Sequence, residues 1–182
     1  MKNALYFLWE VAKIVVIALV IVVPIRYFLF QPFFVKGQSM EPNYETGDYL
    51  IIDELSYRLR NPERGEVIVF KYPNDTTQRY IKRIIGLPGE TIEIKDGQVF
   101  ISKNGSAPEL LNEDNYLAFD IQTAGNLKIT LENDEYFVLG DNRPVSSDSR
   151  RWGVVPRKDI IGRVYLRAWP ITAMAKIALP AY

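Results

Sequence analysis

The stretch Arg79-Tyr-Ile-Lys-Arg-Ile-Ile-Gly-Leu-Pro-Gly89 is typical of a β-strand that ends in a tight turn. Its apolar and β-branched residues favour a strand, and the glycines and the proline at 86–89 end it. Because side chains alternate between the two faces of a strand, Lys82 and Arg83 point in opposite directions. One of the two charges therefore lies among apolar neighbours, and the sequence leaves open which one.

Short runs of the same kind lie on both sides of this stretch, separated by turn residues. Their spacing is typical of an antiparallel β-fold with few helices. The Asp96-Gly97 pair predicts a two-residue hairpin. Residues 103–130 are more polar and irregular, and we interpret them as a small insertion. The further predicted strands are 48–53, 67–72, 91–94, 98–102, 136–139 and 160–167.

The N-terminal residues 4–23 are almost all apolar. About 20 such residues in a helix are enough to cross a lipid hydrocarbon core. A cleaved secretory signal is the alternative, but no small-x-small cleavage site follows the run. The aromatic residues at 27–34 are typical either of a headgroup region or of ordinary core packing. We expect a transmembrane signal anchor with an aromatic interface segment over 1–32, followed by a β-rich domain over 33–182.

The composition excludes several classes of function. The 182 residues include 22 basic and 22 acidic side chains, so no net charge favours a nucleic-acid partner. The absence of cysteine excludes disulfides and thiolate chemistry, and the absence of histidine excludes a Ser-His-Asp triad and histidine-based zinc sites. We expect no metal and no cofactor. Any general base must then be a carboxylate, a tyrosine or a lysine.

A candidate nucleophile lies in Phe33-Phe-Val-Lys-Gly-Gln-Ser-Met40. Its serine, Ser39, would need a base and an oxyanion donor, because a serine hydroxyl alone is a weak nucleophile. Lys82 is a candidate base, since burial would lower its pKa from about 10.4 toward the range where a neutral amine exists. A loop serine and a solvated strand lysine are the alternatives. Sequence spacing does not show whether the two residues meet.

A dense polar segment, Gly140-Asp-Asn-Arg-Pro-Val-Ser-Ser-Asp-Ser-Arg150, combines turn-forming residues with acids and guanidinium groups. It can form an Asx-type turn and an ion pair between Asp148 and either Arg150 or Arg143. Its hydroxyl groups could point at another site. A surface loop with solvated charges is the alternative.

Taken together, four segments closely resemble the sequence boxes of bacterial type I signal peptidases. The resemblance covers residues from about 33 to 164, in the order found in that family. It implies a mostly β fold: an antiparallel β-sheet catalytic domain with a small inserted subdomain, preceded by one N-terminal transmembrane helix. The segments are Gly37-Gln-Ser-Met-Glu-Pro42, Gly47-Asp48, Arg79 to Glu90, and Gly140-Asp-Asn-Arg143 with Ser146, Asp148, Ser149 and Arg150.

The resemblance implies a Ser/Lys dyad, with Ser39 as the nucleophile and Lys82 as the general base. It implies that Ser146 hydrogen-bonds and orients the lysine amine. Asp148 and Arg150 would support the loop by an ion pair. The remaining supporting residues are Gly140, Asp141 and Asn142.

The resemblance also implies that signal peptides are cleaved after Ala-x-Ala and bind as an extended strand. Some family members have a serine two residues before the nucleophile, and this chain has Gly37 there. The oxyanion hole would then use the Ser39 N–H and a second donor that the sequence does not identify. The expected substrate-binding residues are Met40, Val35, Gly37, Tyr80 and Ile81.

The implied partners are preprotein signal peptides and the lipid bilayer. The implied location is the cell membrane, crossed once, with a cytoplasmic N-terminus and an extracytoplasmic catalytic domain. Two other classes of protein stay open. One is a Ser/Lys enzyme of another kind, such as a self-cleaving regulator or a maturase for one dedicated partner. The other is a non-catalytic anchored β-domain that binds peptides or assembles envelope complexes, in which Ser39 and Lys82 would be dispensable.

Overall fold

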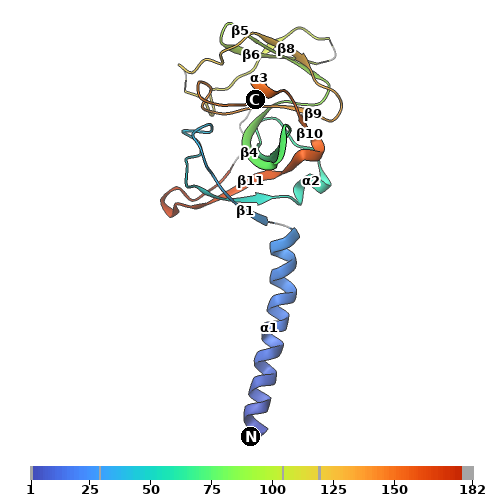
Figure 1. Cartoon of the computed structure of the whole chain (residues 1–182), viewed down its shortest axis with the longest axis vertical. Coiled ribbons are helices and arrows are strands. Elements are labelled where there is room, and N and C mark those ends of the chain that lie inside the picture. Colours follow the sequence, from blue (N-terminus) through green and yellow to red (C-terminus); the bar gives the residue numbers. More distant parts are fainter. Residues whose placement is uncertain (1, 29, 104, 119, 178–182) are drawn as a thin grey trace.

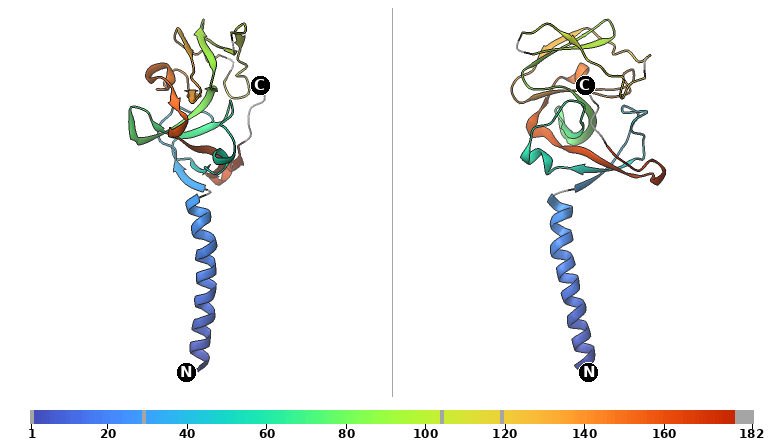
Figure 2. Two further views of the ribbon diagram at one scale, coloured as in Figure 1. Left: turned by 90° about the vertical axis from the view of Figure 1, so that its right-hand side faces the viewer. Right: turned by 180° about the vertical axis from the view of Figure 1, so that it is seen from behind.

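A computed structural model describes residues 2–28, 30–103, 105–118 and 120–177. Helix α1 (Lys2–Phe28) projects from one end of a β-rich body, and strand β1 (Phe30–Phe34) lies where the helix meets that body (Figure 1). Figure 2 shows the same arrangement from two further sides. The body contains two antiparallel sheets, of which the smaller lies at the end away from α1.

Helix α1 contains the apolar N-terminal run, as the sequence predicts a helix there. The large apolar side chains between Tyr6 and Val20 are exposed, and Lys13 pairs with Glu10 at 2.6 Å on the helix surface. Within the ranges that the structure describes, no helix is long and apolar enough to cross a membrane. The membrane-crossing role of this segment therefore stays a prediction.

The larger sheet has eight strands among the described residues, in the order β1-β2-β11-β3-β4-β9-β10 with β12 beside β11. Strand β4, which contains the Arg79–Gly86 stretch, lies near its centre. Short helices connect or follow some of the strands. The strand bounds are β2 Tyr49–Asp53, β3 Val67–Tyr72, β4 Asp75–Gly86, β9 Glu135–Leu139, β10 Val155–Pro156, β11 Ile160–Trp169 and β12 Ala175–Lys176. The helix bounds are α2 Ser56–Leu59, α3 Ser149–Trp152, η1 Arg157–Asp159 and η2 Ile171–Ala173.

The smaller sheet follows β4 directly and has the order β7-β6-β5-β8 in the part of the chain described. Its strands are β5 (Glu90–Lys95), β6 (Gln98–Lys103), β7 (Glu109–Leu110) and β8 (Leu127–Thr130). Asp96 and Gly97 have φ values of 51° and 79° and join β5 to β6, which confirms the predicted hairpin. The smaller sheet begins at Glu90, so the predicted insertion at 103–130 contributes only β7 and β8 to it.

The two sheets pack closely where β4 ends. A Cβ atom on Gly86 would lie only 2.7 Å from the Ile92 side chain, so a glycine is needed at this junction. Residues 81–86 of β4 are all buried, because apolar side chains cover both faces of the strand. Lys82 is 4 % exposed and Arg83 is 5 % exposed. Both side chains therefore lie inside the protein, whereas the alternating pattern predicted that only one of them would be buried.

Candidate functional site

The site is centred on a contact between two residues that are far apart in the sequence. Lys82 lies on β4, and Ser39 lies in the loop that joins β1 to β2. The Lys82 Nζ donates a hydrogen bond to Ser39 Oγ at 2.6 Å and another to the Ile81 carbonyl oxygen at 2.8 Å. The structure thus brings together the two residues that the sequence could not connect.

The surroundings of Lys82 favour its neutral form. Burial lowers the pKa of Lys82 to about 8, although the nearby charges of Asp148 and Asp141 act in the opposite direction. Neither carboxylate forms an ion pair with the amine among the described contacts; both pair with arginines instead. The amine can therefore lose its proton near neutral pH and accept one from the adjacent serine hydroxyl.

An open pocket of about 570 Å³ lies over this pair. Tyr80 and Ile81 line it, as predicted for substrate-binding residues, and Lys36, Arg79 and Val145 also contribute to its wall. Of the other predicted substrate-binding residues, Val35 and Met40 are 2 % and 0 % exposed and pack in the apolar core. Gly37 is outside the lining too. The remaining lining residues are Phe33, Phe34, Gln38 and Ser147.

Gly37 has a conformation that favours glycine. Its φ is 95°, and both its backbone N–H and its carbonyl group are hydrogen-bonded to Thr46 Oγ1, at 3.0 and 3.1 Å. A serine at this position would be strained. The departure from those family members that carry a serine here therefore has a local structural reason.

The segment 140–150 holds the loop that carries Ser39. The Asn142 N–H donates to the Ser39 carbonyl oxygen at 3.0 Å. A Cβ atom on Gly140 would lie 2.4 Å from that same carbonyl oxygen and 2.2 Å from Ser146 Oγ, so only glycine fits. Asp148 accepts a hydrogen bond from the Gly140 N–H at 3.1 Å. These contacts place Gly140, Asn142 and Asp148 beside the loop that carries Ser39.

Asp148 pairs with Arg150, which was one of the two partners considered from the sequence. Arg150 Nε and Nη2 donate to the two carboxylate oxygens at 2.8 and 2.9 Å. Ser146 is also close to the site, but its buried Oγ makes no hydrogen bond within the described part of the chain. Orientation of the lysine amine by Ser146 therefore stays a prediction.

Sequence reasoning missed a buried ion pair behind the site. Arg83 donates to both carboxylate oxygens of Asp141, at 2.8 and 2.6 Å, and Asn43 Nδ2 donates to the same carboxylate at 2.9 Å. Burial lowers the pKa of the Arg83 guanidinium, but the hydrogen bonds to Asp141 outweigh that effect and keep the pKa raised. The alternating pattern of β4 had already signalled that Arg83 could face inward.

A second missed ion pair connects the site to the insertion. Arg143 is 1 % exposed and donates to both carboxylate oxygens of Glu113, at 2.9 and 2.5 Å. It also donates to Thr123 Oγ1, and its Nε donates to the Gly140 carbonyl oxygen at 3.0 Å. Through Arg143, the insertion is thus connected to the 140–150 segment, which in turn contacts the loop that carries Ser39. No local sequence pattern links residues 113 and 143.

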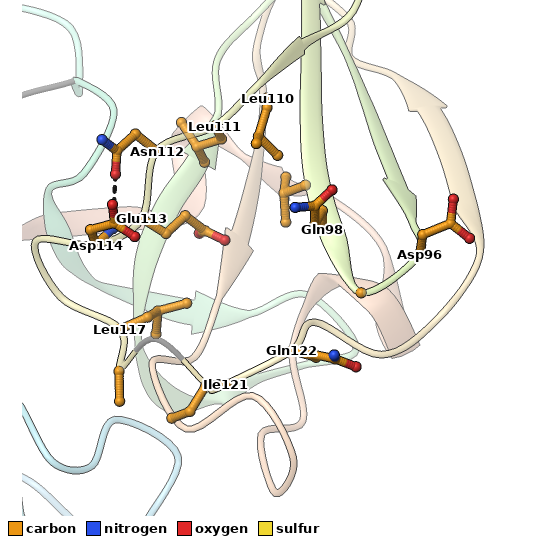
Figure 3. Close-up of a pocket in the computed structure, with 13 residues that line it drawn as sticks. Asp96, Gln98, Leu110, Leu111, Asn112, Glu113, Asp114, Leu117, Ile121 and Gln122 are labelled. Carbon is orange, nitrogen blue, oxygen red and sulfur yellow. Dashed lines mark hydrogen bonds between the residues drawn. The ribbon is translucent and has the colours of Figure 1, made fainter.

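A second pocket, of about 470 Å³, lies beside the smaller sheet and contains neither Ser39 nor Lys82 (Figure 3). Glu113 and Asp114 lie on one side of it, and Asp96 lies on the other. Among the described residues there is no group of three or more acidic side chains arranged to hold a metal ion. Within its described lining, the second pocket thus offers no chemical group comparable to the hydrogen-bonded pair of Ser39 and Lys82.

A serine hydroxyl hydrogen-bonded to a buried amine, on this β-fold, indicates the class of serine hydrolases. Comparison with known proteins identifies the family. A family model described as "Signal peptidase, peptidase S26" matches residues 8–169. The chain belongs to this family, so the predicted family and enzyme class, a signal peptidase and serine endopeptidase, are confirmed.

Two sequence relatives give the same result. The chain is 40 % identical to a probable signal peptidase I-2 of Synechocystis sp., over 89 % of this chain and 73 % of the relative. It is 36 % identical to a signal peptidase I P of Bacillus subtilis subsp. natto, over 92 % and 91 % of the two chains. A crystal structure of a signal peptidase I from Enterococcus faecalis is 32 % identical, with a TM-score of 0.48 over 58 % of this chain and 97 % of the other.

We predict that Glu113→Gln destabilises the protein, because it leaves the buried Arg143 guanidinium without a counter-charge. The expected loss in the free energy of unfolding is about 3 kcal/mol. Urea denaturation, followed by tryptophan fluorescence, measures it. The control is Glu109→Gln, an exposed acid on β7, which should change the free energy by less than about 0.5 kcal/mol. Equal effects of the two substitutions would contradict the assigned role of Glu113.

Proposed function

We propose that this protein is a membrane-bound serine endopeptidase that cleaves signal peptides from exported preproteins after small-x-small sites such as Ala-x-Ala. Ser39 is the nucleophile and Lys82 is the general base. The observation that carries the proposal is the 2.6 Å hydrogen bond between Lys82 Nζ and Ser39 Oγ. The lowered pKa of Lys82 adds to it, since only a neutral amine can act as the base.

The mechanism follows from these two groups. Neutral Lys82 takes the Ser39 proton as Ser39 Oγ attacks the carbonyl carbon of the scissile bond. The resulting ammonium group then donates a proton to the leaving amine, and an acyl-enzyme remains. Lys82, neutral again, removes a proton from the water that attacks the ester, and the ammonium group returns this proton to Ser39 Oγ as the ester bond breaks.

The oxyanion hole is expected to include the backbone N–H of Ser39. This N–H makes no hydrogen bond to any described part of the chain, so it is available for a negatively charged oxygen. The Gly37 N–H is already bound to Thr46 and is less suitable.

Two free strand edges support binding of an extended substrate. Strand β1 is at the edge of the larger sheet, and the chain continues from it through residues 35–37 toward Ser39. Strand β4 pairs with β9 only from Arg83 onward, so the edge at 79–81 is open on that side. A substrate strand between these edges would gain main-chain hydrogen bonds and lie against Ser39 and Lys82.

We also propose that α1 anchors the domain in the cell membrane, with the N-terminus in the cytoplasm and the catalytic domain outside. The large apolar side chains between Tyr6 and Val20 support this role, since they are exposed in the described structure. The contact between α1 and β1 would then hold the site near the lipid surface. A preprotein whose apolar segment is still in the membrane could reach it there.

The central prediction is that Ser39→Ala and Lys82→Ala each abolish cleavage of a preprotein with an Ala-x-Ala site. Each variant removes one partner of the hydrogen bond, and losses of about 10³-fold or more are expected. Gel analysis of detergent-solubilised protein measures the cleavage. Lys95→Ala, at an exposed position on β5, is the control and should remain active. Cleavage by either dyad variant at the parent rate would overturn the assignment.

The pH dependence of kcat/KM should report the deprotonation of Lys82. Activity needs the neutral amine, so the rate should fall about tenfold per pH unit below a midpoint near 8 and level off above it. Initial rates between pH 5.5 and 9.5 measure the profile, with circular dichroism at each pH as a check of folding. A flat profile over this range would argue against Lys82 as the base.

The proposed anchor predicts that the protein sediments with membranes after extraction with alkaline carbonate. A variant that lacks residues 2–28 should instead appear in the supernatant, because the apolar helix has been removed. Immunoblotting of both fractions measures the distribution. Release of the full chain into the supernatant would contradict the anchor without affecting the assignment of Ser39 and Lys82.

A further inference from the structure

The pocket over Ser39 carries positive charge and no negative charge in its lining. Besides Lys82, two basic residues, Lys36 and Arg79, contribute to its wall. Both are exposed, and no aspartate or glutamate lines the pocket. The positive charge of the pocket wall therefore comes from Lys36 and Arg79, whose side chains are exposed to solvent and can contact a ligand.

These two cations are not neutralised by ion pairs in the described part of the chain. Lys36 makes no ion pair there, and the Arg79 Nη1 makes one long contact, at 3.5 Å, with Gln31 Oε1. Glu54 interacts electrostatically with Arg79, but it lies outside the pocket lining and does not come within ion-pair distance. Both basic groups thus remain available to a charged substrate side chain.

Their position relative to the reacting pair indicates which part of a substrate they meet. Lys36 precedes Ser39 by three residues, and Arg79 precedes Lys82 by three residues. On strand β4, at about 3.3 Å per residue, Arg79 and Lys82 are roughly 10 Å apart along the backbone. Lys36 is instead joined to Ser39 through the bend at Gly37, whose φ is 95°. The Arg79 contact with Gln31 on β1 places this end of the pocket toward α1. The apolar part of a substrate, if held in the membrane, would approach from this same end.

We infer that Lys36 and Arg79 select substrates by charge, favouring an acidic side chain and disfavouring a basic one about three to five residues before the cleaved bond. The inference rests on the proposed function. It adds a preference for charge, which shallow apolar pockets for small side chains would not produce. The polar segment between the apolar core of a signal peptide and its cleavage site is the part of the substrate concerned.

The expected effect is moderate because the two cations are exposed. Exposed ion pairs have small energies, and salt screens them with a Debye length of about 8 Å at physiological ionic strength. We expect kcat/KM for a peptide with glutamate to exceed that for the same peptide with lysine by about three- to tenfold at low salt. The ratio should decrease at 0.5 M salt, which distinguishes a charge effect from one of side-chain size.

The experiment uses the full chain in micelles of a neutral detergent and three fluorogenic peptides. The peptides share an Ala-x-Ala site and differ only in glutamate, glutamine or lysine at the fourth residue before the cleaved bond. The quantity compared is the Glu:Lys ratio of kcat/KM within each enzyme variant. Because it is a ratio, a general loss of activity or of folded protein in one variant does not affect it.

Four variants test the two side chains. The double substitution Lys36→Gln/Arg79→Gln should bring the ratio close to one, and Lys36→Glu/Arg79→Glu should reverse the order of the peptides. The conservative Arg79→Lys should retain the preference. Lys95→Gln, which removes one exposed positive charge at the far end of the molecule, is the matched control and should leave the ratio unchanged.

The outcomes separate this inference from the proposed function. Cleavage of all three peptides by the parent enzyme at equal rates would overturn charge selection while supporting the peptidase. A preference for glutamate that persists in the charge-reversed variant would also overturn the assignment to Lys36 and Arg79. Failure to cleave any of the peptides, including the glutamine one, would overturn the proposed function and the inference with it.

Discussion

Covering both faces of β4 is the constraint on which the rest of this structure depends. Removal from water lowers the pKa of a lysine amine, to about 8 for Lys82, and residues 81–86 are buried on both sides. That burial leaves Arg83 inside the protein as well, so the fold needs the buried carboxylate of Asp141 to pair with it. The burial of β4 thus explains both the lowered pKa of Lys82 and the ion pair between Arg83 and Asp141.

The segment 140–150 connects this strand to the candidate nucleophile. Its backbone binds the Ser39 carbonyl group, while its carboxylates pair with arginines rather than with Lys82. A direct ion pair with Lys82 would stabilise the ammonium form and raise the pKa of the amine. Pairing the acids with guanidinium groups keeps them near the site without that effect. The Glu113–Arg143 pair extends the same arrangement into the insertion.

The sequence predicts local features of the fold well and distant contacts poorly. Alternating apolar residues and turn pairs such as Asp96-Gly97 depend on neighbours in the chain, and the predicted strands and that hairpin were found. Strands β1, β7, β8, β10 and β12 were not predicted. The resemblance to signal peptidases pointed to Ser39 and Lys82, but no spacing rule could show that they meet across 43 positions. The same holds for Glu113 and Arg143. Met40 and Val35 lie in the core, not in the substrate pocket. Their burial depends on how distant strands pack, which the sequence of one segment does not reveal.

One strand carries both the amine of Lys82 and the open edge at 79–81. In the proposed complex, the base and the substrate are therefore fixed to the same backbone. A bound strand presents alternate side chains to opposite faces, so moving it by one residue would exchange the inward and outward side chains. The position of the cleaved bond would then depend on which substrate side chains point toward the enzyme, as well as on the size of those side chains. Small side chains at alternating positions are what such a geometry would accept.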